Sequence, residues 1–452
     1  MRIDSFIRRH LTLRVVDIIK KTKMVPMYKK LMVSQWMDHS TLEALQMKRL
    51  ICLLKHAYEN VPYYHRIFDR VGLDVSQFCD VSELSKIPIL TKRIIRKNFY
   101  DLQASNKVKF QPRRNQTSGS TGQPLIFNWD RESHSAGWAN VWRALAVSGN
   151  NIGDEILILS GGALMPKITP TKQRIYYELM GIKQLRAYHL SEEEIGSYVD
   201  YLCKAPRKPR YMYAYASAAY LLARKLIEMK KQSHFFDAVF TTSEVLKPGY
   251  RQVIEKAMGC KVYDTYGNNE SCLYGFECER QKGLHYAMEN AYLEILDNEG
   301  KEANSGETGR LIGTNLKNYA MPFIRYDTGD LGSLIHEPCS CGRGLMRIGS
   351  IMGRTRDFIF TPDGRKIHGA FFNHFEPFYK TPWIESWHVR QDRINHIDII
   401  LRPDGEPIQS DIDYMRKLLK RSLGANMEID FIIDNKLSIT PACKQKVIER
   451  LI

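Results

Sequence analysis

Residues 117–124 read TSGSTGQP, a run of hydroxyl side chains and glycines that ends in a proline. Glycines leave backbone N–H groups unobstructed and short hydroxyl side chains add further donors, so such a loop can surround phosphate oxygens. The run lacks the Gly-Lys-Ser/Thr string of a Walker P-loop. Taken alone, it therefore predicts either a phosphate-binding loop or a surface turn.

Three further motifs follow in order, namely YGNNE at 266–270, RYDTGDLG at 325–332 and GRTRDFI at 353–359. Together with the first run they resemble the motifs of the adenylate-forming superfamily, which includes acyl-CoA synthetases, adenylation domains and luciferases. Upstream, residues 53–68 (LLKHAYENVPYYHRIF) and 84–99 (LSKIPILTKRIIRKNF) resemble the phenylacetate-CoA ligase branch. That branch also contains capsule-biosynthesis ligase-like proteins and coenzyme F390 synthetases.

The resemblance implies an enzyme, an AMP-forming acid–thiol ligase. A carboxylic acid, with an aryl acid as the nearest example, would react with Mg²⁺·ATP to give an acyl-adenylate and pyrophosphate. Coenzyme A would then accept the acyl group, and the product could serve polysaccharide or capsule biosynthesis. Two other outcomes remain open within the branch: acyl transfer to an amine, or AMP transfer to a phenolic hydroxyl.

The resemblance also implies an ATP or AMP site. Its residues are Thr117, Ser118, Gly119, Ser120, Thr121, Gly122, Tyr266, Gly267, Asn268, Asn269, Asp330 and Arg354. Tyr266 would lie against adenine, and the two carboxylate oxygens of Asp330 would accept hydrogen bonds from the ribose hydroxyls. Glu270 matches the carboxylate that binds Mg²⁺, a cation that prefers hard oxygen ligands.

Three residues are implied to be catalytic, namely Thr117, Glu270 and Lys444. Lys444 lies in TPACKQK, where Cys443 replaces the usual glycine and Lys446 is the alternative lysine. A mobile ammonium group would neutralise the charge that develops at the α-phosphate. Arg356 falls at the hinge position about which the small domain rotates between the two half-reactions.

Four soft ligands are close in the second half of the chain: Cys278, His285, Cys339 and Cys341. Residues of these types suit a closed tetrahedral zinc site that would be structural, because four protein ligands leave no position for water. Cys272 is a possible substitute ligand. Free, buried thiols are the alternative interpretation.

For the acyl group, the resemblance implies a pocket that includes Tyr215, Ser243, Glu244 and Thr265. Tyr213 and Phe240 would add aromatic surface to this pocket. The alternative is that these aromatic side chains are ordinary core residues.

The chain of 452 residues carries 66 Lys and Arg against 50 Asp and Glu, a net charge of +16 that attracts polyanions. A non-catalytic polyanion-binding protein is therefore the rival class, although the absence of an RNA-binding aromatic motif argues against a specific nucleic-acid partner. Residues 1–30 mix basic and apolar side chains, which predicts either a helix at an anionic membrane surface or one packed on the domain. No apolar run is long enough to span a bilayer, so a cytoplasmic protein is expected.

The helices and strands that must position these residues can be predicted from the pattern of apolar and β-forming residues. Short β-rich runs alternate with helical stretches between 155 and 297, which predicts an α/β domain of mostly parallel sheets flanked by helices. Ligands of such sheets bind at the carboxyl ends of strands. Past Gly353 a different alternation of β-rich runs and helical stretches begins, and it predicts a small mobile α+β domain with a closing helix from about residue 442. We therefore expect a basic helical segment (1–40), a large adenylate-forming domain (41–353) and a C-terminal lid domain (354–452).

Overall fold

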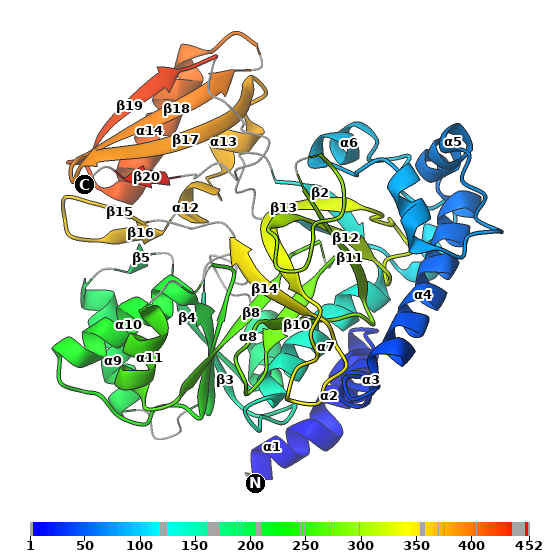
Figure 1. Cartoon of the computed structure of the whole chain (residues 1–452). Coiled ribbons are helices and arrows are strands. Elements are labelled where there is room, and N and C mark those ends of the chain that lie inside the picture. The colour runs from blue at the N-terminus through cyan, green and yellow to red at the C-terminus, as the bar shows by residue number, and fades with distance from the viewer. Residues whose placement is uncertain are drawn as a thin grey trace.

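Figure 1 shows the computed structural model of the chain. The described residues are 3–117, 124–160, 171–187, 189–190, 192–204, 209–244, 246, 249–270, 272–297, 299–352, 358–368, 370–373, 375–403, 405–435 and 448–450. A large domain of mixed α and β structure carries a small C-terminal domain with its own sheet (Figure 1). This arrangement confirms the predicted fold class.

The large domain is built on an 11-stranded sheet with the order β11-β12-β13-β14-β10-β9-β8-β7-β6-β3-β4. Its strands are β3 (Ile156–Ser160), β4 (Ile182–Arg186), β6 (Tyr211–Tyr215), β7 (Ala238–Thr242), β8 (Lys261–Gly267), β9 (Tyr274–Glu277), β10 (Leu284–Tyr286), β11 (Ala291–Leu296), β12 (Gly309–Asn315), β13 (Tyr326–Ile335) and β14 (Arg347–Met352). Strands β4, β3, β6, β7 and β8 pair in parallel, whereas the pairs from β8 to β11 are antiparallel. The expected parallel strands thus occupy one half of the sheet, and β8 joins the two halves.

Helices cover both faces of the parallel half. They are α7 (Arg131–Ala146), α8 (Thr171–Met180), α9 (Glu192–Lys204), α10 (Ala216–Glu228) and α11 (Tyr250–Met258). Alternate residues of β3 face opposite layers: Ile156 and Ile158 pack with α7, whereas Leu157 and Leu159 pack with α9, α10 and α11. Burial on both faces explains why the first four residues of β3 are all apolar.

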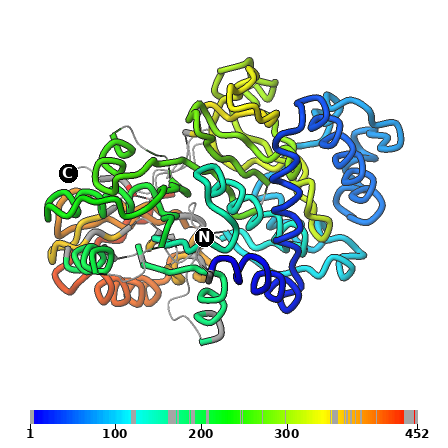
Figure 2. Tube along the Cα trace, turned by 90° about the horizontal axis from the view of Figure 1, so that it is seen from below, coloured from blue at the N-terminus to red at the C-terminus, as the bar shows by residue number. Residues whose placement is uncertain are grey.

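Helices also form the N-terminal part of the chain, which Figure 2 shows crossing the underside of the large domain. They are α1 (Ile3–Ile7), the π-helical turn η1 (Arg8–Thr12), α2 (Leu13–Ile19), α3 (Met24–Ser34), α4 (His39–Asn60), α5 (Pro62–Val71) and α6 (Lys92–Lys97), with 3₁₀ turns η2 (Val81–Lys86) and η3 (Lys107–Phe110). The Asp38 carboxylate caps α4 by accepting a hydrogen bond from the Thr41 N–H at 2.8 Å. None of the helices described here combines the length and apolarity that crossing a bilayer requires.

The small domain contains a four-stranded sheet with the order β19-β18-β17-β20. Its elements are β17 (Ile384–Arg393), β18 (His396–Pro403), β19 (Glu428–Ile433), β20 (Ile448–Arg450), α12 (Ala370–Asn373), α13 (Glu376–Lys380) and α14 (Gln409–Leu423). The expected closing helix is wrong over residues 448–450, because these form β20 and pair in parallel with β17. The expected domain boundary at 353–354 lies outside the described residues.

A short sheet connects the small domain to the large one. Its strands are β15 (Phe358–Phe360), β16 (Lys366–His368) and β5 (His189–Leu190), and β16 lies between the other two. Because β5 comes from the large domain, the two domains share backbone hydrogen bonds at this point (Figure 1).

Candidate active site

A cavity of about 650 Å³ lies at the carboxyl ends of β6, β7 and β8. This is the edge of a parallel sheet where ligands are expected to bind. Further lining residues come from α7, β9, β13 and β14, so both halves of the sheet contribute to the wall. The volume falls in the usual range for small-molecule sites.

Eleven of the predicted site residues line this cavity: Thr117, Tyr215, Ser243, Glu244, Thr265, Tyr266, Gly267, Asn268, Asn269, Glu270 and Asp330. The other predicted nucleotide-binding, catalytic and hinge residues lie outside the described residues: Ser118, Gly119, Ser120, Thr121, Gly122, Arg354, Arg356, Lys444 and its alternative Lys446. Tyr213 also lines the cavity. Phe240 is not among the lining residues; it is fully buried and stacks on Tyr263 in the apolar cluster that also contains Ile158 and Tyr213.

Thr117 holds the base of the predicted phosphate loop. It follows β1 (Arg113–Gln116), and β1 pairs antiparallel with β2 (Ile126–Trp129). The Thr117 N–H donates to the Leu125 carbonyl and the Leu125 N–H donates to Thr117 Oγ1, both at 2.9 Å. Two hydrogen bonds therefore fix the chain on either side of residues 118–123.

Two tyrosines connect the YGNNE and RYDTGDLG motifs. The hydroxyl of Tyr266 donates to Asp330 Oδ2 at 2.8 Å, and the hydroxyl of Tyr326 donates to Glu270 Oε1 at 2.5 Å. Each motif thus supplies a tyrosine that holds the carboxylate of the other motif. Hydrogen bonds to ionised groups are stronger than neutral ones, so both carboxylates are well oriented.

Neighbouring amides fix the loop that carries Glu270. Asn268 Oδ1 accepts hydrogen bonds from the backbone N–H groups of Cys272 and Leu273, at 2.8 and 3.2 Å. Asn269 Nδ2 donates to the Gln116 carbonyl at 2.7 Å and so ties this loop to β1. Asn268 Nδ2 is buried and finds no partner among the described residues, which leaves a donor for a ligand at the cavity wall.

The predicted acyl-pocket residues surround the start of α10. Glu244 Oε2 accepts hydrogen bonds from the Ser217 N–H at 2.9 Å and from its hydroxyl at 2.5 Å. A carboxylate at this place is favoured by the positive end of the helix dipole. Tyr213 donates to Thr242 Oγ1 at 3.0 Å, and Thr265 Oγ1 donates to the Thr241 carbonyl at 2.7 Å. These contacts fix the polar edge of the pocket.

Asp264 is a cavity residue that sequence reasoning did not select. Its Oδ1 accepts hydrogen bonds from Thr241 Oγ1 at 2.7 Å and from the Thr265 N–H at 3.0 Å. Burial raises the pKa of Asp264 to about 7, and the nearby Glu277 acts in the same direction. Its place in KVYDTYG, one residue before the TYG string, was the available signal.

His134 is a second missed residue, on α7. Burial, aided by the positive charge of Arg113, lowers the pKa of His134 to about 4. Its Nδ1 is buried without a hydrogen-bond partner in the described part of the chain. His134 and Trp138 line the cavity although no motif includes them, so no sequence signal could have found them.

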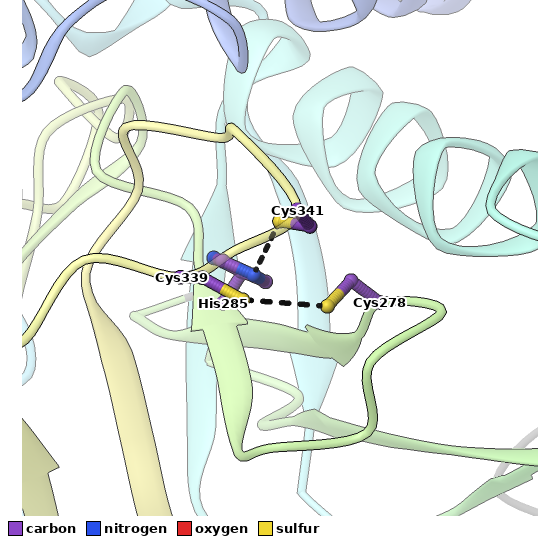
Figure 3. A group of neighbouring side chains, drawn as sticks. All are labelled: Cys278, His285, Cys339 and Cys341. Carbon is purple, nitrogen blue, oxygen red and sulfur yellow. Dashed lines mark hydrogen bonds between the residues drawn. The ribbon is translucent and has the colours of Figure 1, made fainter.

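The four predicted zinc ligands lie together (Figure 3), and none of them lines the cavity. Cys278 directly follows β9, His285 lies in β10, and Cys339 and Cys341 lie in the loop before β14. Their ligand atoms are all within 4.8 Å of one another. Cys272 is not a member of this group, because it is buried elsewhere with its thiol 3.6 Å from the Glu270 carbonyl.

Comparisons with known proteins place this geometry in context. No protein-family model matches the chain. The phenylacetate-coenzyme A ligase of Escherichia coli (strain K12) is 30% identical over 358 residues, which cover 75% of this chain and 78% of the relative. Protein CapK of Staphylococcus aureus is 25% identical over 410 residues, which cover 89% and 88%.

A solved structure is similar over nearly the whole chain. It is 2-hydroxyisobutyryl-CoA ligase in complex with 2-HIB-AMP and CoA in the thioesterification state, with a TM-score of 0.61 and 20% identity. The similarity covers 92% of both chains. At this identity the likeness shows a shared fold, in which a large domain and a small C-terminal domain are joined in one chain.

Proposed function

Because this chain belongs to the phenylacetate-CoA ligase family and is an AMP-forming acyl-CoA ligase, we propose that it activates an aryl acid with ATP and transfers the acyl group to coenzyme A. Membership of the family favours an enzyme over a non-catalytic polyanion-binding protein. The observation that carries the residue-level proposal is the convergence of Thr117, the Tyr266–Asp330 pair and the Tyr326–Glu270 pair on one cavity.

Each of these groups suits one part of ATP. The loop that starts at Thr117 is proposed to bind the phosphates, and Asp330 is proposed to accept hydrogen bonds from the ribose hydroxyls. Tyr266 would present its ring to adenine while its hydroxyl holds Asp330. We further propose Lys444 as the lysine that neutralises charge at the α-phosphate, and Arg354 and Arg356 as the ribose-binding and hinge residues.

Glu270 is proposed to bind Mg²⁺ on the nucleotide. The residue is only 6% exposed and Tyr326 holds one of its carboxylate oxygens, so the group is fixed at the cavity wall. Mg²⁺ commonly binds one or two protein carboxylates together with substrate phosphates, and this donor set fits that pattern. The ion would neutralise phosphate charge during adenylation.

An aryl acid is proposed because the cavity presents rings and apolar side chains. Those outside the YGNNE and RYDTGDLG motifs include Trp138, Val141, Ile158, Tyr213, Tyr215 and Leu246. Aromatic faces and edges stack favourably with a substrate ring. The adjacent polar edge at Glu244 and Thr265 would orient the ring.

Coenzyme A is the proposed acceptor, and polysaccharide or capsule biosynthesis is the proposed context. Support for the context comes from the resemblance to capsule-biosynthesis ligase-like proteins and from similarity to Protein CapK over most of the chain. An amine acceptor or AMP transfer to a phenolic hydroxyl are outcomes that the assay below separates.

ATP–pyrophosphate exchange with a panel of aryl, fatty and amino acids tests the proposal. We expect exchange to be fastest with an aryl acid, and AMP and a thioester to appear when coenzyme A is added. The Lys444→Ala variant should lose exchange, with Lys446→Ala as its matched control. Absence of exchange with every acid would contradict the proposed adenylation, and AMP release that needs an amine instead of coenzyme A would contradict the proposed acceptor.

We also propose that the N-terminal helices contact an anionic membrane surface. One face packs on the domain through Leu13 and Val16, whereas several apolar side chains point outward. Those exposed are Phe6, Ile7, Leu11, Val15, Ile18 and Ile19, together with Ile175 and Leu179 of α8. Basic Arg14, Lys20 and Lys21 are close in the chain and are also exposed. Apolar and basic side chains on one helix are typical of interfacial binding to anionic lipid.

Co-sedimentation of the full chain with vesicles tests this contact. Binding to vesicles that contain phosphatidylglycerol, and weaker binding to pure phosphatidylcholine, are expected. The variant Ile18→Glu should lose binding because the side chain is 76% exposed, and Val108→Glu is a control at a similarly exposed apolar residue on another surface. Equal sedimentation of both variants would contradict the proposed surface.

A further inference from the structure

We propose that Cys278, His285, Cys339 and Cys341 bind one Zn²⁺ ion in a closed, structural site, here called the Cys₃His cluster. Their side chains converge from two separate segments of the chain (Figure 3). The first three are buried and Cys341 is half-buried, so the donors form a shielded group. The proposal is independent of the ligase reaction.

Two distances within the Cys₃His cluster match the edges of a tetrahedron around zinc. Zn–S bonds of about 2.3 Å and Zn–N bonds of about 2.0 Å imply a sulfur–sulfur edge of about 3.8 Å and a sulfur–nitrogen edge of about 3.5 Å. The Cys278 and Cys339 sulfurs are 3.7 Å apart, and Cys341 Sγ is 3.4 Å from His285 Nε2. A disulfide would require about 2.05 Å, so the Cys278 and Cys339 sulfurs are not bonded to each other and both remain able to bind an ion.

The surroundings prepare His285 and Cys341 as ligands. His285 Nδ1 is 3.0 Å from the Leu345 carbonyl, an acceptor that places the proton on Nδ1 and leaves the Nε2 lone pair toward the cluster. Such an outer hydrogen bond is the usual support of a zinc-bound histidine. The Arg343 N–H points to Cys341 Sγ at 3.5 Å and stabilises a thiolate.

Charge and donor type favour zinc over other ions. Three thiolates with Zn²⁺ carry one net negative charge, and the positively charged Arg343 follows Cys341 by two residues in the same loop. Soft sulfur ligands with one imidazole in tetrahedral arrangement are typical of zinc, whereas Mg²⁺ and Ca²⁺ require oxygen. Four protein ligands leave no open position, so the ion would have a structural role.

The ion would link the active-site wall to the N-terminal helices. Cys278 and His285 belong to the β9–β10 hairpin, whose Phe276 and Leu284 line the cavity. The loop with Cys339 and Cys341 continues into Arg343, which packs at 4.4 Å over the ring of Trp36 and donates to Gln35 at 3.0 Å.

The same loop approaches the start of α4 too closely for any side chain at Gly344. A Cβ atom there would lie 2.1 Å from the Met37 carbonyl, and the Gly344 carbonyl is 3.0 Å from His39 Nδ1. Loss of the ion would therefore loosen both the hairpin and this helix junction.

Metal analysis of the purified full chain tests the proposal. The protein is produced in zinc-supplemented medium and freed of loosely bound metal by gel filtration. Inductively coupled plasma mass spectrometry should then find about one zinc ion per chain. Cys339→Ser and Cys341→Ser should each lose most of that zinc, whereas Cys79→Ser, at an exposed thiol outside the cluster, should keep it. Zinc content far below one in the native chain, or unchanged content in both cluster variants, would overturn the proposal.

Cobalt provides a second readout in case a serine variant fails to fold. The native chain produced in cobalt-supplemented medium should show the visible bands of tetrahedral thiolate-bound Co²⁺. A chelator should lower the melting temperature of the zinc form, and added Zn²⁺ but not Mg²⁺ should restore it. Octahedral cobalt bands, or a Cys278–Cys339 disulfide in the native chain by mass spectrometry, would overturn the proposal. None of these readouts depends on ligase activity.

Discussion

The hydrogen bond from the Leu125 N–H to Thr117 Oγ1 gives a sharp test of the proposed phosphate loop. Thr117→Val removes the acceptor and preserves the branched shape of the side chain. Thr117 is 6% exposed and Leu125 is fully buried, so water does not readily replace the lost partner. The second bond, from the Thr117 N–H to the Leu125 carbonyl, remains in the variant.

The magnitude follows from the burial of the Leu125 N–H. A buried donor left unpaired costs about 1–3 kcal/mol. If this cost falls on the loop conformation that binds nucleotide, the KM for ATP rises about 5- to 150-fold, since 1.4 kcal/mol is a factor of ten. ATP–pyrophosphate exchange at varied ATP measures the change, and thermal unfolding separates it from a loss of fold stability.

Thr117→Ser is the matched variant because it keeps the hydroxyl and removes only a methyl group. It should stay much closer to the parent enzyme than Thr117→Val in both assays. An unchanged KM for ATP in the valine variant would refute the reasoning about the loop. Equal damage in the serine variant would show that methyl packing, and not the hydrogen bond, determines the effect.

Three further predictions concern the cavity wall. Glu270→Gln should slow pyrophosphate exchange about 100-fold, because the charge that would bind Mg²⁺ is lost. Glu299→Gln, on the exposed surface, is the control. An exchange rate near the parent value in Glu270→Gln would exclude the Mg²⁺ role. Tyr266→Phe removes a hydrogen bond to the Asp330 carboxylate and should raise the KM for ATP about tenfold, and an unchanged KM would contradict the assigned pairing. The pKa of Asp264 is raised to about 7, so the folded protein favours the protonated acid and stability falls as pH rises from about 4 to about 7. Over this pH range the free energy of unfolding of the parent protein should fall by up to about 4 kcal/mol through Asp264, and Asp264→Asn should abolish that fall. If the variant and the parent lose stability equally between these pH values, the raised pKa of Asp264 is contradicted.

The alternation of β-rich runs and helical stretches in the sequence was sufficient to predict the parallel half of the sheet. Strand β3 is buried at every position and its first four residues are all apolar, because both faces are covered, and helices lie between the parallel strands along the chain. The antiparallel half and the β5–β16 pairing were not predicted. A two-residue strand such as His189–Leu190 has no pattern of its own, and its partner is set by the position of a distant domain.

The sequence predicted residues that line the cavity where a recognisable motif lies at the end of a strand. Thr265 lies near the end of β8 and Glu270 follows the strand within three residues, so a local string was enough to select them. His134 and Trp138 reach the cavity only because α7 packs across the sheet, and their spacing is that of any helix. A contact created by packing between layers leaves no local signal in the sequence.

The two tyrosine–carboxylate pairs show how the site depends on the whole fold. The sequence assigned Asp330 to ribose and Glu270 to magnesium as if each motif acted separately. In the structure, Tyr266 holds Asp330 and Tyr326 holds Glu270, across 64 and 56 residues of chain. A shift of β13 relative to β8 would therefore displace both carboxylates together. The spacing between the proposed ribose-binding and metal-binding groups is thus set by the packing of these strands, and neither motif could determine it alone.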